Sequence, residues 1–278
     1  VVLIPLNMIF MHGLGPIPAL GSAGCGFATS ILQWLMLITL AGYIYKASAY
    51  RNTSIFSRFD KINLTWVKRI LQLGLPIGLA VFFEVSIFST GALVLSPLGE
   101  VFIAAHQVAI SVTSVLFMIP LSLAIALTIR VGTYYGEKNW ASMYQVQKIG
   151  LSTAIFFALL TMSFIALGRE QIVSVYTQDI DVVPVAMYLL WFAMGYQLMD
   201  ALQVSAAGCL RGMQDTQAPM WITLMAYWVI AFPIGLYLAR YTHWGVAGVW
   251  LGLIIGLSIA CVLLLSRLYL NTKRLSKT

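Results

Sequence analysis

The sequence has 278 residues, a formal net charge of +7, and only 9% charged against 60% hydrophobic residues. A soluble domain usually carries about a quarter charged residues, so this composition excludes a soluble protein and indicates an integral membrane protein. The three cysteines, Cys25, Cys209 and Cys261, have no paired spacing. We therefore expect them to pack in helices and not to form disulfides or bind metal.

The chain begins with a short apolar run, Val1–Phe10, which is about half of the ~20 residues that a membrane-spanning helix needs. No charged segment precedes it, so it does not resemble a signal peptide. We expect it to be the end of a helix whose earlier part precedes this sequence. A turn rich in Gly and Pro follows at residues 12–21.

Seven apolar segments then follow, each long enough to cross a bilayer as a helix. They lack the period-two alternation of barrel strands, and only helices or closed barrels satisfy their backbone hydrogen bonds in hydrocarbon. The sequence therefore predicts an all-α, polytopic transmembrane helix bundle. The expected spans are residues 22–45, 70–95, 101–130, 145–167, 183–208, 220–239 and 246–268.

The basic residues indicate the orientation, because cytoplasmic loops carry an excess of Lys and Arg. If the connection at residues 46–69 is cytoplasmic, 14 of the 16 basic residues fall on that side, and only Arg169 and Arg240 fall outside. The positive charge is then explained by a cytoplasmic face next to anionic lipid, and no nucleic acid partner is expected. The C-terminus is expected in the cytoplasm.

A short pattern occurs twice. Pro5 is followed by Gly21-Ser-Ala-Gly24 and a full apolar helix, and Pro233 is followed by Gly245-Val-Ala-Gly248 and another. Chance can produce so short a match, but transporters are often built from duplicated modules. Under duplication, residues 1–45 end a first lobe, 46–69 form a cytoplasmic linker, 70–268 form a second six-helix lobe, and 269–278 form a cytoplasmic tail.

Two acidic residues lie inside apolar spans: Glu84 near the middle of 70–95, and Asp200 in the inner half of 183–208. A charge at such a depth costs about 2.5–3.5 kcal/mol on insertion scales. Such residues normally face a polar cavity, another helix or an ion. The alternative is a protonated acid that makes a hydrogen bond between packed helices.

The spacing of Tyr196, Asp200 and Gln203, at i, i+4 and i+7, places them on one face of one helix. A hydroxyl, a carboxylate and an amide form a plausible cation site. Gln107, next to His106, lies about two turns into its helix, where a polar pair alone is a weak indication of function.

Burial disfavours the charged form of a carboxyl group, so such an acid can exchange a proton for a cation near neutral pH. Cation arrival and substrate departure would then compete for one site, and neutralising the acids would change which helix packing is favoured. The sequence contains no phosphate-binding P-loop, no zinc motif and no nucleophile motif, so we expect no enzyme and no cofactor besides the coupling ion.

Four stretches together resemble the multidrug and toxic compound extrusion (MATE) family, in its bacterial NorM-type branch. They are LPIGL at residues 75–79 with Phe83 and Glu84, AAHQ at 104–107, IRVG at 129–132, and GCLRGMQD at 208–215. Their order and spacing also fit, and the match extends from Val1 to the tail.

The resemblance implies twelve helices in two lobes, and export of organic cations and hydrophobic drugs in exchange for Na⁺ or H⁺ by a monomer in the bacterial inner membrane. By position, Glu84, Tyr196 and Asp200 match residues of the coupling-cation site, with Glu84 and Asp200 as Na⁺ ligands under sodium coupling. Gln107 and Asp179 match residues that contact substrate, and Gln203 is grouped with them. The family's first lobe also carries an acidic site, on a helix that this sequence does not contain.

Three alternatives stay open. A lipid-linked oligosaccharide flippase of the same superfamily should line its cavity with basic residues, whereas the charges predicted at mid-membrane are acidic. A seven-helix receptor would match the number of complete spans but not the repeated Gly pattern. A membrane-embedded enzyme would need a nucleophile or metal set that we do not find.

Overall fold

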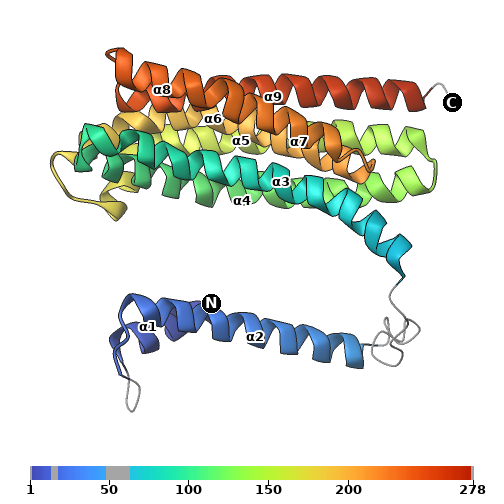
Figure 1. Ribbon diagram of the computed structural model, residues 1–278, viewed down its shortest axis with the longest axis horizontal. Helices are drawn as coiled ribbons and strands as arrows, with labels where there is room; N and C mark the ends of the chain where they lie inside the picture. The colour runs from blue at the N-terminus through green and yellow to red at the C-terminus, as the bar shows by residue number, and fades with distance from the viewer. Residues whose placement is uncertain (1, 14–17, 48–62, 277–278) are drawn as a thin grey trace. The chain divides into compact units, whose positions relative to one another are not determined.

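A computed structural model describes residues 2–13, 18–47 and 63–276. Within these residues the secondary structure is helical, and seven helices are long and apolar enough to cross a membrane. The chain separates into two units, Val1–Leu64 and Thr65–Thr278, and each is described by itself (Figure 1). The predicted all-α bundle with seven spans is confirmed.

The first unit is a helical hairpin. Helix α1 covers Leu3–His12 and helix α2 covers Ser22–Lys46. The turn is closed by the Leu20 amide, which donates to the Phe10 carbonyl over 3.1 Å. Gly24 of α2 packs directly on the backbone of Phe10, where a Cβ atom would clash.

The second unit contains the remaining spans, which run side by side (Figure 1). Its elements are α3 (Leu64–Leu95), the short 3₁₀ turn η2 (Ser96–Leu98), α4 (Glu100–Gly136), α5 (Trp140–Tyr176), α6 (Val182–Gly212), α7 (Gln217–Leu224), the π-helical segment η3 (Met225–Ala231), α8 (Phe232–Tyr241) and α9 (Val246–Leu275). Elements α7, η3 and α8 together make one span, Gln217–Tyr241.

Several helices extend beyond the spans expected from hydropathy. Helix α3 begins at Leu64 instead of residue 70, and α9 continues to Leu275 instead of 268. Hydropathy marks the part that crosses hydrocarbon, whereas the helical hydrogen bonds can continue through the interfacial region. Most of the predicted 46–69 linker, residues 48–62, lies outside the described residues.

Helix α6 forms the centre of the second unit and packs against α4, α5 and α9. Every residue from Val204 to Leu210 is buried. The contact with α4 is close because Gly208 lies against the Ala124 carbonyl, to which an added Cβ would come within 2.6 Å. The Thr128 hydroxyl also donates to the Gly208 carbonyl over 2.9 Å, so the α4–α6 pair combines small residues with an interhelical hydrogen bond.

The two Gly-rich turns have the same local structure. Gly21 and Gly245 precede α2 and α9 with φ of +54° and +48°, a conformation that favours glycine. Gly24 and Gly248, three residues after these glycines, each pack closely against the backbone of the preceding helix. Both the backbone conformation and the packing role therefore recur at the two turns, while duplication stays a prediction.

Candidate functional site

A cavity of about 460 Å³ lies within the second unit, lined by α3, α4 and α6. Its polar lining includes Glu84 of α3, His106 and Gln107 of α4, and Tyr196 of α6. Glu84 is the only Asp, Glu, Lys or Arg side chain in this lining. The cavity thus brings together Glu84, Gln107 and Tyr196, three residues that the sequence places on three different helices.

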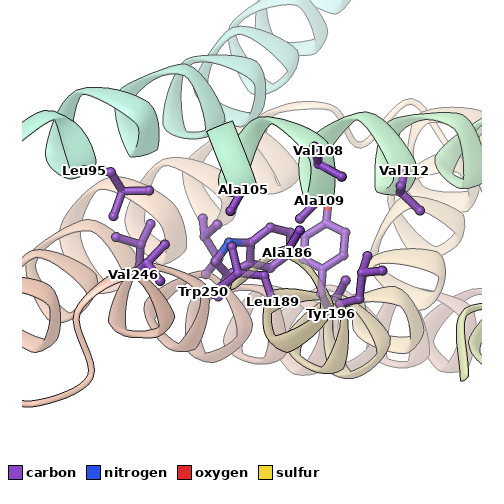
Figure 2. Close-up of a cluster of buried hydrophobic side chains, with 14 of the residues drawn as sticks. Leu95, Ala105, Val108, Ala109, Val112, Ala186, Leu189, Tyr196, Val246 and Trp250 are labelled. Atoms are coloured by element: carbon purple, nitrogen blue, oxygen red, sulfur yellow. The ribbon is translucent and has the colours of Figure 1, made fainter. Parts of the chain in front are cut away.

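The wall around these groups is aromatic and apolar. Phe88, one turn from Glu84, packs edge-to-face on Tyr196 with ring centroids 5.9 Å apart. Trp250 of α9 lies behind Tyr196, at 6.2 Å, and behind His106, at 5.9 Å. Figure 2 shows Tyr196 and Trp250 beside Ala105 and Ala109 of α4, whose small side chains leave room for the rings.

Asp200 is completely buried, one helical turn from Tyr196, as the i, i+4 spacing predicts. Its carboxylate oxygens make no hydrogen bond of good geometry in the described structure, although the Tyr196 hydroxyl lies near enough for a weak one. It lies near enough to Glu84 and Tyr196 to interact electrostatically with both. A buried carboxyl group with so little hydrogen bonding is costly, so this position suits a protonated acid or a bound cation.

Gln203 and Asp179 do not line the cavity. Gln203 is buried, and its Oε1 accepts a hydrogen bond from the Tyr227 hydroxyl over 2.7 Å. Asp179 is exposed between α5 and α6. Its Oδ1 accepts from the amides of Asp181 over 2.9 Å and Val182 over 3.3 Å, so this carboxylate caps the start of α6.

The donors suit a hard cation. The described residues contain no group of three or more His, Cys, Asp or Glu side chains that could hold a metal. A cation here would take its ligands from the carboxylates of Glu84 and Asp200 and from neutral oxygens such as the Tyr196 hydroxyl. Hard monovalent and divalent cations prefer such oxygen donors.

Sequence reasoning missed several residues around this site. Trp250 and Tyr227 are fully buried and contact Tyr196 and Gln203, respectively. Neither lies on α6, so periodicity within α6 cannot reveal these contacts. Arg211 of α6 interacts electrostatically with Glu84. In the sequence Arg211 is one of many basic residues near a helix end, so it indicates only the predicted orientation. His106 was noted only as the neighbour of Gln107.

Long apolar helices around a cavity that contains one acidic side chain define a polytopic membrane protein. The sequence profile of the MatE family matches residues 76–237. The chain is 73% identical over 277 residues to the "Probable multidrug resistance protein NorM" of Acinetobacter baylyi, covering 100% of this chain and 62% of the relative. It is 43% identical over 272 residues to the "Multidrug resistance protein NorM" of Vibrio cholerae, covering 96% and 59%. The chain belongs to the MatE family, in agreement with the predicted resemblance.

Solved structures agree on the fold. The eukaryotic MATE transporter AtDTX14 superposes with a TM-score of 0.88 at 20% identity, over 99% of this chain and 61% of that one. An outward-facing multidrug resistance MATE family transporter superposes with a TM-score of 0.87 at 22% identity, over 100% and 61%. The chain therefore spans about three fifths of the length of the proteins it matches.

Proposed function

We propose that the full-length protein containing this chain exports organic cations and hydrophobic drugs in exchange for Na⁺ or H⁺. Asp200 carries the proposal: it is a completely buried carboxyl group, one helical turn from Tyr196, and it is coupled electrostatically to Glu84 on the cavity wall. The names of the two NorM relatives as multidrug resistance proteins support the substrate class.

The cavity is suited to a drug-sized ligand. Its volume of about 460 Å³ falls in the range of about 300–1,000 Å³ that is usual for small-molecule pockets. The rings of Phe88, Phe117 and Tyr196 provide flat apolar surfaces for a planar cation, Glu84 provides the charge, and Gln107 provides an adaptable polar contact. A flippase for a pyrophosphate-linked lipid is disfavoured, because the cavity lining offers no Lys or Arg.

In this mechanism a cation or proton and a drug compete for the same negative charge. Binding of one Na⁺ or H⁺ at Glu84 and Asp200 removes one unit of negative charge from the pair. This weakens the attraction for a cationic drug, which then leaves. Since the neutral and charged acids favour different helix packing, ion occupancy biases the transporter between its two faces. We place the protein in the bacterial inner membrane, as a monomer with a cytoplasmic C-terminus.

The test is dye efflux from cells that express the full-length gene product, with Na⁺ or choline medium and with or without a pH gradient. Glu84→Gln and Asp200→Asn each keep the side-chain shape but remove the charge. We expect each to lower cation-driven efflux by about tenfold or more, which corresponds to a loss of at least about 1.4 kcal/mol of cation binding.

The control is Asp181→Asn, which removes an exposed acid from the loop before α6 and should leave efflux unchanged. Wild-type efflux by both Glu84→Gln and Asp200→Asn would show that this site does not couple a cation to export. Efflux that is independent of both gradients would exclude the antiport mechanism itself.

A further inference from the structure

The span Gln217–Tyr241 contains an irregular segment: residues Met225–Ala231, η3, form a π-helix between α7 and α8. Pro233 follows two residues later. A proline in a helix removes one backbone hydrogen bond, and its ring clashes with the carbonyl four residues earlier, here that of Val229. The wider π-helical turn relieves this conflict, and such turns occur frequently at functional sites.

The first contact of η3 is with α6, the helix that carries Asp200. Tyr227 is fully buried, and its hydroxyl donates to Gln203 Oε1 over 2.7 Å. Gln203 lies three residues from Asp200, and Tyr227 interacts electrostatically with both Asp200 and Glu84. The hydroxyl therefore ties η3 to α6 about one helical turn from the buried acid.

The second contact is with α3, the helix that carries Glu84. Trp228 Nε1 donates to the backbone carbonyl of Phe83 over 3.2 Å, and Phe83 directly precedes Glu84. Adjacent residues of one π-helical turn thus hold the two acid-bearing helices, Tyr227 on α6 and Trp228 on α3.

The segment has a firm support on its other side. Gly256 of α9 packs directly on Ala231, and an added Cβ at Gly256 would lie 2.8 Å from the Ala226 carbonyl. Ala226 and Ala231 are both buried. Because α9 packs against the backbone of η3, η3 has little room to move by itself. A displacement of α6 can therefore be transmitted through η3 to α3.

We propose that Tyr227 and Trp228 are positioning residues, through which η3 holds Asp200 and Glu84 at the separation that binds the coupling cation. This inference rests on the proposed function. A fixed separation pre-organises the two acids, so loss of either contact weakens cation binding before it affects turnover. The two contacts act through one segment, so cutting the first makes the second less effective.

The experiment measures efflux by the full-length gene product as a function of the concentration of the driving cation. Tyr227→Phe and Trp228→Phe each remove one hydrogen bond and keep an aromatic ring. We expect each to raise the half-saturating cation concentration by about threefold to tenfold, the ratio that loss of one hydrogen bond gives, with little change in maximal rate. The double variant should raise it by less than the product of the two single effects, as expected for coupled residues.

Matched controls lie on the same span. Tyr237→Phe and Trp221→Phe remove the same polar groups from residues that are 61% and 55% exposed, and they should leave the half-saturating concentration unchanged. This concentration does not depend on how much folded protein a cell holds, so lower expression of a variant does not imitate the effect.

The possible results separate the two proposals. An unchanged half-saturating concentration in Tyr227→Phe and Trp228→Phe, or a lower maximal rate alone, overturns the positioning role while Glu84→Gln and Asp200→Asn still abolish coupling. If the double variant raises the half-saturating concentration by the full product of the two single effects, the two contacts do not act together through η3. Wild-type efflux by the two acid variants overturns the proposed function, and the positioning role with it.

Discussion

The packing of α9 on the span Gln217–Tyr241 gives a sharp prediction for Gly252→Ala. A Cβ at Gly252 would lie 2.5 Å from Gly235 Cα, 2.6 Å from Gly235 N and 2.7 Å from the Ala231 carbonyl oxygen, whereas ordinary contact begins at 3.4 Å. All three neighbours are backbone atoms, which no rotamer change can move. The two helices must therefore separate locally by about 0.9 Å, the difference between 3.4 Å and 2.5 Å.

The free energy follows from two opposing effects. Overpacking of a close interface costs about 1–3 kcal/mol, while Gly→Ala inside a helix returns about 0.5–1 kcal/mol. We therefore expect Gly252→Ala to lower the free energy of unfolding by about 1 kcal/mol at the midpoints of these ranges, and by at most about 2.5 kcal/mol. In Gly78→Ala, where no atom lies within 4 Å of the added Cβ, only the helix effect acts, and stability should rise by about 0.5–1 kcal/mol.

The assay is unfolding of the purified chain in mixed micelles by increasing SDS, followed by circular dichroism, with wild type and both variants in parallel. The comparison with Gly78→Ala separates the clash from the general effect of alanine in a helix. If Gly252→Ala is as stable as Gly78→Ala, α8 and α9 do not pack as closely as described. The inference that α9 supports η3 would then also be refuted.

Two further predictions concern polar contacts at the two ends of the second unit. Asp179→Ala removes the cap of α6 and should lower the free energy of unfolding by about 1 kcal/mol, whereas Asp179→Asn should lower it little because Asn caps equally well. The Asn variant also tests the predicted substrate contact. Reduced efflux of cationic dyes at normal stability would support that contact, and unchanged efflux would exclude it. Asp215 Oδ2 accepts from Arg267 Nε over 2.8 Å and from Asn271 Nδ2 over 2.7 Å. Because the Arg267 side chain is 43% exposed, Asp215→Ala should lower the free energy of unfolding in SDS by only about 1 kcal/mol, and by less at high salt. A loss that does not change with salt would argue against an ionic contribution.

The fold was largely predictable because hydropathy is a local property. Seven spans were expected, and the described part of the chain contains seven. Their ends were not predictable, since helical hydrogen bonds continue beyond the hydrocarbon that hydropathy detects. The glycines at 21 and 245 were recognisable as a repeated pattern, and the recurrence of a positive φ at both gave that pattern a structural meaning.

The candidate site was predictable in part. An acid inside an apolar span is conspicuous in any sequence, so Glu84 and Asp200 were found, and helical spacing placed Tyr196 beside Asp200. The meeting of Glu84 with Gln107 and Tyr196 around one cavity was not derivable from spacing, because the three lie on different helices. Their roles in binding a cation or a drug stay predictions until transport is measured.

By itself the sequence determined that this protein lies in a membrane as a bundle of helices with two acids inside apolar spans. Composition, hydropathy and helical period act within one segment, and they need no partner to be evaluated. Only the tertiary structure decided which helix faces meet. It determined the complete burial of Asp200, the cavity beside Glu84, and the π-helical turn whose Tyr227 and Trp228 contact two different helices. Those features depend on close approaches between distant segments, which small residues such as Gly252 permit but do not specify.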